Sequence, residues 1–497
     1  MSQAVIVVGG GPTGLMLTAE LGIAGVPAIL LEREPEPRWW SQAFAIHTST
    51  YEMFKQRDLD RYPDAPRFQN YNYGFPGIVA MDESNIPRIV PQRLVEGLLS
   101  DRLADHPSVE VRRGHELLDL AQDADGVTAT VRGPEGEYTL RAPYLVGCDG
   151  GRSKVRKIAG IGFPGTDATL CGRTGDMEIL NEEYRDGIAP KVLPKGLCAV
   201  IKHPDEPGLF RGTVIEYDSE RPSEDVPMTG EEFREAFLKV TGIDLKIGRT
   251  GWLTRFGDAV RHASDYRAER VFIAGDAAHL HFPSAGQGLN TGMQDAMNLG
   301  WKLAGVMNGH VSSEILDTYH RERHPVGFET CVYPQAQVAL MHPFERSAPL
   351  RQLFGELMQF EDVSHYLVQR SSGLGIRYAM EYPDDVAVDH PLLGLRITDL
   401  PLVTDDGETS TARLLHAGRG VVLNTTGDPK ATAGLSGWED RVDTVVAQPV
   451  EAIDAAVLLI RPDGHIAFVD PDGEHTGGLT AALNTWFGAP SVVPTPA

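Results

Sequence analysis

The sequence predicts an α/β fold in which a parallel sheet flanked by helices is interrupted by a mainly antiparallel sheet and followed by a small C-terminal α/β domain. Short apolar runs at Ala4–Val8 and Val271–Ala274 are typical of buried parallel strands, and each precedes a glycine-rich loop and a helical stretch. From about Cys171 to Arg267 the composition changes. We therefore expect four segments, at residues 1–170, 171–269, 270–390 and 391–497.

The first strand ends in a GxGxxG pattern formed by Gly9, Gly11 and Gly14, and a helix is predicted from Leu15 to about Ala24. Gly9 permits a tight turn, Gly11 lets the backbone approach a pyrophosphate, and Gly14 lets the helix pack on the strand. A second predicted strand ends at Glu32, where an acid accepts hydrogen bonds from ribose hydroxyls. A plain glycine-rich turn needs neither the helix nor the acid, so this setting predicts a dinucleotide site.

The stretch from Arg270 to Ala304 has the features of a second half of the same site. Its strand ends at Gly275-Asp276, the position at which open α/β sheets bind ligands. A helix predicted from about Leu289 would direct unpaired N–H groups at an anion or at an electron-rich ring edge. One fingerprint at the start of the chain, completed from far along it, is the organisation of an FAD-binding fold, with Asp276 suited to a ribityl hydroxyl.

A local cluster of cations follows another predicted buried strand, which ends in Asp149-Gly150. The cluster contains Arg152, Lys154, Arg156 and Lys157, with Ser153 among them. In an acidic protein such a cluster could bind the phosphates of a nicotinamide cofactor, or it could be the solvated start of a helix.

The segment from about Cys171 to Arg267 is predicted to form an antiparallel sheet with one amphipathic helix. Strands are expected at Leu197–Lys202, Phe210–Tyr217 and Trp252–Phe256, and the helix at Glu231–Val240 with Phe233, Phe237 and Leu238 directed inward. After Ala304 the chain is predicted to be mainly helical to about Arg377. The last part has predicted strands at Gly420–Leu423, Ala456–Ile460 and His465–Val469, and a closing helix at Leu479–Phe487.

Composition limits the possible functions. The net charge of −24 argues against a general nucleic-acid or anionic-membrane surface, and no apolar run approaches the roughly 20 residues of a membrane span. The four cysteines form no CxxC pair, which disfavours a disulfide framework or a zinc site. We expect a cytoplasmic protein with reduced thiols, as a monomer or homodimer.

Three motifs in order closely resemble the single-component (class A) flavoprotein aromatic hydroxylases of the para-hydroxybenzoate hydroxylase fold. They are GGGPTG with Glu32, CDGGRSKVR at Cys148–Arg156, and the long stretch from Gly275 to Ala304. The segment Val457–Val469 resembles the thioredoxin-like C-terminal domain of the phenol hydroxylase and aromatic polyketide hydroxylase branch. No CxxC follows Cys331, so this domain cannot perform thiol redox chemistry.

The resemblance implies that FAD is the cofactor, NADPH or NADH the reductant, and O2 and a small aromatic molecule the substrates. It implies one set of cofactor-binding residues: Gly9, Gly11, Pro12, Thr13, Gly14, Glu32, Arg33, Gln42, Gln92, Leu118, Asp149, Asp276, Pro283, Gly286, Gly288, Leu289 and Asn290. The NAD(P)H candidates are Arg152, Ser153 and Arg156. Where the family commonly has an arginine in a Ser-Arg-Ala segment, this chain has Gln42, which keeps hydrogen bonding but loses the charge.

The implied reaction passes hydride from NAD(P)H to the flavin and then transfers one oxygen atom through a flavin C4a-hydroperoxide to a polycyclic, polyketide-type aromatic. Hydroxylation, Baeyer–Villiger insertion and epoxidation share this intermediate, and the sequence does not separate them. Candidates for the substrate pocket are Tyr73, Phe75, Trp252, Phe256 and Pro283, although aromatic clusters such as that around Tyr73 and Phe75 more often serve packing. No catalytic acid, base or nucleophile is identified.

Other flavin-dependent classes lack support in the sequence. A halogenase would carry a WxWxIP motif and a disulfide reductase a CxxxxC pair, and neither is present. The alternative class is a flavin-dependent halogenase, despite the missing motif, or a partner-reduced flavoprotein. No third ligand is spaced to join His279 and His281 in a metal site, so no metal is expected.

Overall fold

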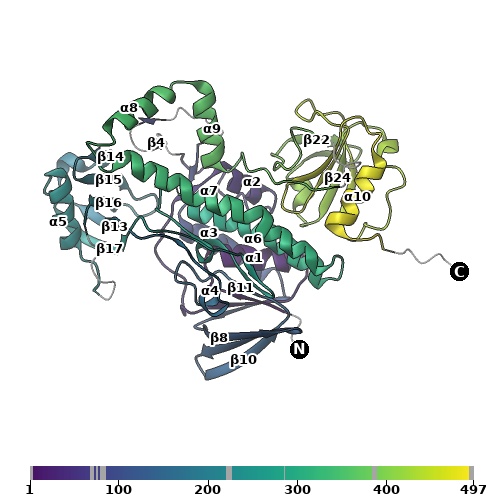
Figure 1. Ribbon diagram of the computed structural model, residues 1–497, viewed down its shortest axis with the longest axis horizontal. Helices are drawn as coiled ribbons and strands as arrows, with labels where there is room; N and C mark the ends of the chain where they lie inside the picture. Colours follow the sequence, from purple (N-terminus) through teal and green to yellow (C-terminus); the bar gives the residue numbers. More distant parts are fainter. Residues whose placement is uncertain are drawn as a thin grey trace.

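The structure is a computed structural model that describes residues 4–67, 86–219, 226–284, 286–382 and 389–491, together with the backbone of a two-stranded hairpin, β4 (Asn72–Tyr73) and β5 (Gly77–Ile78). Figure 1 shows an elongated molecule with three regions along its longest axis. An antiparallel sheet with one helix lies at one end, a parallel sheet with long helices lies in the middle, and a small α/β domain lies at the other end.

The central sheet has six strands in the order β19-β20-β11-β1-β2-β7. The five longer strands pair in parallel, and β19 runs antiparallel at the edge. Their bounds are β1 (Val5–Val8), β2 (Ala28–Glu32), β7 (Val109–Arg113), β11 (Leu145–Gly147), β19 (Arg267–Ala268) and β20 (Val271–Ile273). Because β20 pairs with β11, with Leu145 opposite Val271, the chain does return to the first sheet near Arg270, as predicted.

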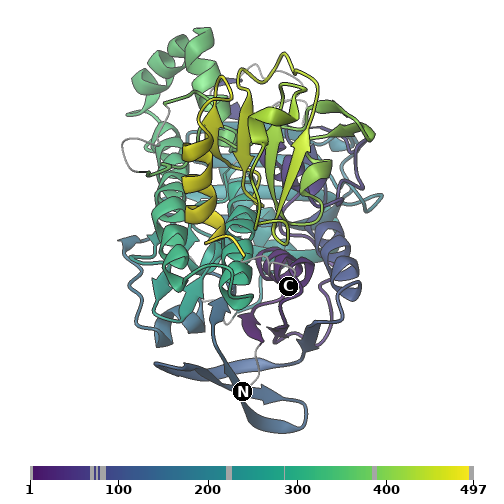
Figure 2. The ribbon, with the colours of Figure 1, turned by 90° about the vertical axis from the view of Figure 1, so that its right-hand side faces the viewer.

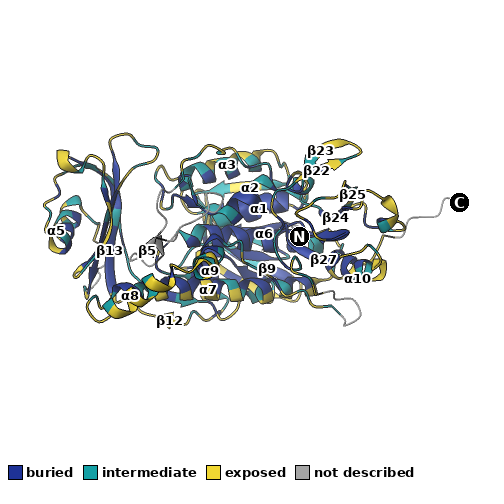
Figure 3. Ribbon diagram, turned by 90° about the horizontal axis from the view of Figure 1, so that it is seen from above, coloured by how far each residue is buried: buried dark blue, intermediate teal, exposed yellow. Residues whose placement is uncertain are grey.

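Long helices cover this sheet. The pair α1 (Pro12–Ile23) and α6 (Gln287–Met307) pack closely, and α3 (Gln92–Ala104) lies against α1. In Figure 3 both α1 and α6 are largely buried at the centre of the molecule. Helix α6 begins at Gln287, two residues before its predicted start, and α1 begins at Pro12, which suits the first turn because its missing N–H has no intrahelical partner there.

Smaller elements surround the central sheet. A three-stranded antiparallel sheet packs beside helix α4, and a pair of short strands (β3-β6), a second three-stranded sheet (β12-β18-β21) and helix α2 connect the larger elements. Their bounds are β8 (Glu116–Asp123), β9 (Gly126–Gly133), β10 (Gly136–Ala142), α4 (Lys154–Ile158), β3 (Ala45–Ile46), β6 (Arg88–Ile89), α2 (Thr48–Lys55), β12 (Gly165–Thr166), β18 (Val260–His262) and β21 (His279–Leu280).

The inserted sheet is antiparallel throughout, in the order β14-β15-β16-β13-β17, as the sequence predicted. Its strands are β13 (Leu170–Ile179), β14 (Ile188–Leu193), β15 (Gly196–Lys202), β16 (Phe210–Tyr217) and β17 (Ile247–Phe256), and helix α5 (Gly230–Thr241) packs on one face. Within α5, Phe233 and Phe237 are fully buried, but Leu238 is 40% exposed. Its predicted inward position is wrong, because the buried stripe follows Phe233, Ala236, Phe237 and Val240 and leaves Leu238 on the solvent side.

Three helices follow α6: α7 (Asp317–Met341), α8 (Ala348–Leu357) and α9 (Glu361–Ser372). Single 3₁₀ turns lie at Glu182–Tyr184, Gly275–Ala277, Ser313–Leu316, Arg413–Leu415 and Pro429–Thr432. Within the residues that the structure describes, no helix has the length and apolar character that crossing a bilayer requires.

The C-terminal domain has a mixed four-stranded sheet in the order β25-β24-β26-β27, flanked by helix α10 and preceded by a hairpin, the arrangement expected of the predicted thioredoxin-like domain (Figure 2). The bounds are β24 (Gly420–Asn424), β25 (Val442–Val446), β26 (Val457–Ile460), β27 (Ile466–Asp470), α10 (Thr476–Phe487), β22 (Pro401–Thr404) and β23 (Gly407–Ser410). The four segment boundaries proposed from the sequence stay predictions.

A buried ion-pair cluster joins this domain to α6 and α7. The Arg461 guanidinium donates to both carboxylate oxygens of Glu322, at 2.7 and 2.9 Å, and Lys302 Nζ lies 2.8 Å from Glu322 Oε2. All three side chains are at most 5% exposed. Burial opposes ionisation of Glu322, but Arg461 and Lys302 bring its pKa down to about 2.

Candidate functional site

The GxGxxG loop has the geometry that its three glycines predict. Gly9 has a φ of +108°, and a Cβ there would lie 2.3 Å from the Cys148 carbonyl oxygen. A Cβ on Gly14 would lie 1.9 Å from the Gly9 carbonyl oxygen, so only glycine lets α1 pack so closely. At Gly11 a Cβ would meet no atom within 4 Å. The surface above Gly11 is therefore open to a ligand, as a pyrophosphate site requires.

Two helix N-termini converge on this loop without side-chain caps. Helix α1 is capped by Gly11 and α6 by Gly286, and neither cap residue supplies a side-chain hydrogen bond. Thr13 Oγ1 lies 2.7 Å from the position of a Cβ on Gly275 and 2.4 Å from that of a Cβ on Gly292, which brings the two helices together. Their N–H groups are available to an anion and to an electron-rich ring edge.

Asp276 and His281 lie beside the start of α6. A Cβ on Gly288 would be 3.6 Å from Asp276 Oδ1 and 3.5 Å from His281 Nε2. The Asp276 side chain is exposed, as a ligand for a hydroxyl must be, and Pro283 is exposed in the same loop, with half-buried Leu289 in the first turn of α6. These residues surround one end of α6 as predicted, and their contacts with a cofactor stay predictions.

The segment from Ser41 to His47 runs past the same helix end. Asn290 Nδ2 donates to the Ala45 carbonyl oxygen at 2.9 Å, and Asn290 Oδ1 accepts from the His47 N–H at 2.9 Å. Gln92 Oε1 accepts from the Ala43 N–H at 3.3 Å. The Gln42 side chain is exposed. Asn290 and Gln92 therefore hold the backbone of this segment in place, whereas Gln42 leaves its side chain free to meet a ligand.

Acidic residues close the other side of the loop. Glu32 accepts from the Gly10 N–H at 2.6 Å and from the Glu34 N–H at 2.9 Å, and the neighbouring Arg33 side chain is exposed. Asp149 Oδ2 accepts from the N–H groups of Lys154 and Val155, but Asp149 Oδ1 is buried with no hydrogen-bond partner among the described residues. An unpartnered carboxylate oxygen beside an open glycine loop fits a hydroxyl of a bound cofactor. Leu118 lies half-buried on β8.

Asp295 links the loop after β20 to two helices. Its carboxylate accepts from the Gly275 N–H at 3.0 Å, from His279 Nε2 at 2.8 Å and from Arg323 Nε at 2.7 Å. The side chains of Asp295, His279 and Arg323 are all fully buried. Burial raises the pKa of Asp295, but Arg323 and His279 hold it below its usual range. Asp295 therefore acts as the buried counter-charge that joins this loop to α6 and α7.

The loop at Phe282 also meets the inserted sheet. The ring centroids of Phe256 and Phe282 are 6.0 Å apart, so the structure brings together the two regions between which the substrate pocket was predicted. Tyr217, at the end of β16, belongs to the same apolar cluster and is 7% exposed. Its hydroxyl is buried with no hydrogen-bond partner among the described residues, as is Nδ1 of His342, whose ring lies 4.7 Å away. Two buried polar atoms thus lie unpaired in an apolar setting.

The remaining aromatic candidates have different surroundings. Trp252 stacks on Trp40 with ring centroids 4.6 Å apart and an angle of 9° between the planes, so packing occupies one face of its ring. Tyr73 lies in β4, whose backbone alone is described, and Phe75 lies outside the described residues. The packing alternative was weighed for the cluster around Tyr73 and Phe75, so it stays a prediction.

Residues 2–331 match the protein family described as FAD binding domain, and residues 390–490 match the family described as aromatic-ring hydroxylase, C-terminal. The chain belongs to the FAD-dependent aromatic-ring hydroxylases. This confirms the resemblance to class A hydroxylases, and this hydroxylase is an FAD-dependent monooxygenase that uses NAD(P)H and O2. The open glycine loop, the two uncapped helices and the unpaired Asp149 oxygen fit FAD.

Several proteins are similar to this hydroxylase over nearly their whole length. It is 41% identical to the 12-dehydrotetracycline 5-monooxygenase/anhydrotetracycline 6-monooxygenase of Streptomyces rimosus, over 99% of this chain and 100% of that protein. The solved structure of an anhydrotetracycline hydroxylase from Streptomyces rimosus superposes with a TM-score of 0.90 at 39% identity, covering 98% of this chain and 99% of that chain. The dialkyldecalin synthase of Streptomyces rugosporus is 39% identical, over 98% of this chain and 99% of that protein.

In this hydroxylase the side chains of two NAD(P)H candidates, Ser153 and Arg156, are buried. Ser153 is fully buried and its hydroxyl accepts from the Arg156 N–H as the N-cap of α4. The Arg156 guanidinium donates to the carbonyl oxygens of Ala277 and Gly151, and it stacks on Phe163 at 3.6 Å. These bonds use the polar groups of Ser153 and Arg156 within the fold, and contact of either residue with NAD(P)H stays a prediction. Arg152 alone of the three presents an exposed side chain.

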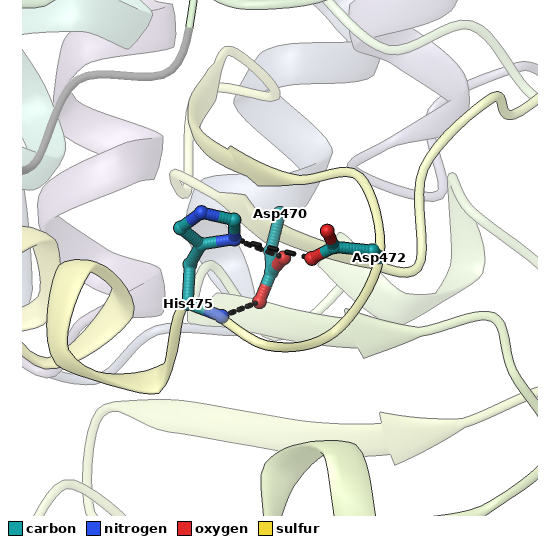
Figure 4. Close-up of side chains that lie close together, drawn as sticks. All are labelled: Asp470, Asp472 and His475. Carbon is teal, nitrogen blue, oxygen red and sulfur yellow. Dashed lines mark hydrogen bonds and ion pairs between the residues drawn. The ribbon is translucent and has the colours of Figure 1, made fainter.

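The two histidines that were considered as a metal pair, His279 and His281, have separate partners. His279 bonds to Asp295, and His281 Nδ1 lies 2.8 Å from the Phe282 carbonyl oxygen, so the two imidazoles have different partners. Asp470, Asp472 and His475 approach one another in the turn before α10 (Figure 4). There Asp470 is 1% exposed and accepts from the N–H groups of Gly473 and His475, which makes it the cap of this turn.

Three residues of the substrate side were not identified from the sequence: Tyr217, Arg211 and Asp176. Tyr217 lay in a correctly predicted strand, but nothing local indicates that its hydroxyl lacks a partner. Arg211 stands in the same apolar strand, and a buried arginine there requires a carboxylate, which is the one signal that the sequence offered. That carboxylate, Asp176, is on another strand.

Proposed function

We propose that this hydroxylase transfers one oxygen atom to a polycyclic aromatic compound that carries keto or phenol oxygens, with ring hydroxylation as the reaction. The observation that supports this most directly is the cluster at the end of β16. It consists of the buried apolar side chains of Leu170, Leu197, Phe282 and Met341 around the unpaired Tyr217 hydroxyl. A flat apolar ring system with one or two oxygens would satisfy both kinds of surface.

The names of similar proteins support the same substrate class. The relative from Streptomyces rimosus is named for tetracycline precursors, and a solved structure of similar fold is an aromatic hydroxylase from angucycline biosynthesis, at 38% identity and a TM-score of 0.90. The dialkyldecalin synthase has a different reaction name at nearly the same identity. The experiment must therefore measure incorporation of oxygen and not substrate binding alone.

The chain's own residues have defined tasks in this reaction. Burial raises the pKa of Tyr217 to about 12, with Arg351 opposing, so the phenol stays neutral and donates a hydrogen bond to a substrate oxygen. The N-terminal N–H groups of α6 stabilise negative charge at the ring edge of the cofactor. The apolar side chains of the cluster around Tyr217 exclude water and orient the substrate. Bound FAD, reduced by NAD(P)H, supplies the chemistry that activates O2.

The position of NAD(P)H and the compartment belong to the same proposal. Arg152 is the candidate for contact with the nicotinamide cofactor, since its side chain is exposed next to the turn that follows Asp149. A cytoplasmic location is supported by the need for NAD(P)H and by cysteines that form no disulfide among the described residues.

The test is anaerobic reduction of the FAD-bound protein by NADPH with and without anhydrotetracycline as a polycyclic probe, followed by reaction with ¹⁸O₂. We expect the probe to accelerate flavin reduction and the product to gain one ¹⁸O atom. Conversion of the probe without ¹⁸O would refute oxygen transfer in favour of a non-oxidative reaction. Failure of NADPH to reduce the flavin with any ligand would indicate reduction by a partner protein.

A Tyr217→Phe variant tests the proposed contact. Loss of one hydrogen bond of about 0.5–1.5 kcal/mol predicts a KM for the probe about 2–10-fold higher. Tyr138→Phe is the matched control, because Tyr138 lies on β10 and bonds to His115, away from the cluster. Equal effects of the two substitutions would contradict the assignment.

A further inference from the structure

A buried arginine of the inserted sheet contacts the backbone of the segment that passes the start of α6. Arg211, on β16, is 7% exposed. Its Nη2 donates to the Ser41 carbonyl oxygen at 2.7 Å and its Nη1 to the Gln42 carbonyl oxygen at 3.2 Å. We propose that Arg211 is a positioning residue for the flavin, in that it fixes the segment Ser41–Ala45 against the inserted sheet and so sets where the flavin ring is held.

Asp176 orients the Arg211 guanidinium. Arg211 Nε lies 2.6 Å from Asp176 Oδ1 and its Nη2 lies 3.0 Å from Asp176 Oδ2, a bidentate pair at 2–7% exposure. Arg211 also lies over the rings of Phe44, at 4.4 Å, and Trp252, at 4.9 Å. A guanidinium that is paired bidentately and held between two aromatic rings has one orientation, so its remaining donors have a fixed direction.

A second chain of contacts keeps this pair in register with α3. His203 Nε2 lies 3.5 Å from Asp176, and His203 Nδ1 lies 2.9 Å from Asp205. Asp205 in turn lies 2.6 Å from the guanidinium of Arg93. The inserted sheet is thereby joined to α3, which carries Gln92, by charged side chains as well as by the Arg211 contacts.

The segment that Arg211 holds leads directly to the cofactor side. Gln92 Oε1 binds the Ala43 N–H, and Asn290 Nδ2 binds the Ala45 carbonyl oxygen. A Cβ on Gly286 would lie 2.7 Å from Ala45 Cβ, so the start of α6 touches the segment. Arg211 and Asn290 therefore hold opposite ends of the same five residues, and a displacement at Ser41 would move the wall of the cofactor site.

Position 42 is glutamine in this chain, and its side chain is exposed. Arg211, from the inserted sheet, places a positive charge against the backbone of this segment. Trp252, a substrate candidate on β17, stacks on Trp40 and contacts the Arg211 guanidinium, so the inserted sheet holds this side chain from a second strand.

The inference rests on the FAD site of the proposed function but not on the identity of the substrate. Its test compares Arg211→Lys with Arg173→Lys in the full-length protein. Arg173, on the adjacent strand β13, is also 7% exposed and also binds carboxylates, at 2.9 Å to Glu232 and 3.4 Å to Glu216, but it has no bond to Ser41 or Gln42. It is a matched control for the loss of a buried guanidinium.

Three quantities are measured for each variant: the FAD dissociation constant, collisional quenching of bound FAD by iodide, and the thermal unfolding temperature. A lysine cannot reproduce the four hydrogen bonds of Arg211, so we expect about 10-fold weaker FAD binding and about 2–3-fold stronger quenching. Arg173→Lys should change both by less than about 2-fold at a similar loss of thermal stability.

The double variant Arg211→Gln/Asp176→Asn removes both charges and avoids an unpaired buried ion, so it carries the test if Arg211→Lys does not fold. It should show the same increase in quenching. Equal effects of the Arg211 and Arg173 substitutions on FAD affinity and quenching would overturn the proposal, as would a wild-type protein that does not bind FAD. A wild-type protein that binds FAD but does not oxygenate the probe would refute only the proposed substrate.

Discussion

Replacing Asp295 by asparagine should strongly destabilise the protein, because it leaves a buried cation without its counter-charge. The Arg323 guanidinium is fully buried and would keep only its bonds to the Tyr378 hydroxyl, at 3.0 Å, and the Thr291 carbonyl oxygen, at 3.1 Å. The asparagine would also present an amide N–H₂ either to Arg323 or to the Gly275 N–H, both of which are donors. Removing one partner of a buried ion pair costs about 3–5 kcal/mol.

The assay is urea unfolding of the FAD-free protein, followed by circular dichroism, with the FAD dissociation constant measured in parallel. Asp295 holds the Gly275 N–H next to Asp276, so FAD binding should weaken as well. The double variant Asp295→Asn/Arg323→Met should recover part of the stability, because no unpaired charge remains. Glu182→Gln, at an exposed pair with Arg185, is the control and should change stability by less than about 0.5 kcal/mol. A loss below about 1 kcal/mol for Asp295→Asn, or no recovery in the double variant, would refute this reasoning.

Two further predictions concern the glycine loop and the domain junction. Gly11→Ala should leave the unfolding temperature of the FAD-free protein unchanged but weaken FAD binding by about 10-fold or more, because its Cβ meets no protein atom and would occupy the space of the ligand. Gly14→Ala should lower that unfolding temperature, since its Cβ would overlap the Gly9 carbonyl oxygen; equal melting of the two variants would contradict the assignment. The Glu322 pKa lies at about 2, below its usual value, so its ionised form stabilises the folded state above about pH 4.5 and this contribution is lost as the pH falls toward 2. Urea unfolding across this range should show Glu322→Gln with lower stability at pH 7 and a shallower acid dependence than the wild type; an unchanged slope would disprove the linkage.

The parts of the site that the sequence predicted are those whose physics is local. Gly9, Gly11 and Gly14 lie within six consecutive residues, between a strand and a helix. Each could therefore be assigned a role from the sequence, and the geometry of the loop agrees with those roles. The return of the chain to the sheet was predictable for the same reason, since a short apolar run that ends in Gly275-Asp276 is typical of a buried parallel strand at a ligand site. Class A similarity supplied the choice of FAD, which geometry alone left open.

The errors and omissions share a different cause: they depend on what a side chain meets far along the chain. Arg156 was a candidate for contact with NAD(P)H, but its guanidinium donates a hydrogen bond to the Ala277 carbonyl oxygen, 121 residues away. Arg211 reaches the Ser41 carbonyl oxygen across 170 residues. Backbone carbonyls carry no sequence signal, so an arginine that binds them looks the same in the sequence as one that faces solvent. The predicted burial of Leu238 was wrong for a similar reason, because the face of a helix that is buried depends on where the sheet lies.

Helix α7 shows how a C-terminal domain without a CxxC motif bears on the cofactor site. Its consecutive residues Glu322 and Arg323 have different partners. Glu322 forms an ion pair with Arg461 of the C-terminal domain, and Arg323 binds Asp295 next to the loop that carries Asp276. Lys302, on α6, also binds Glu322. The buried charges that Arg461 joins therefore lie on α6 and α7, the two helices that shape the flavin site. Loss of Arg461 would leave Glu322 with a single buried cation in place of two, and α7 would transmit that change toward Asp295 through one peptide bond. The domain thus completes a buried charge cluster that joins it to α6 and α7.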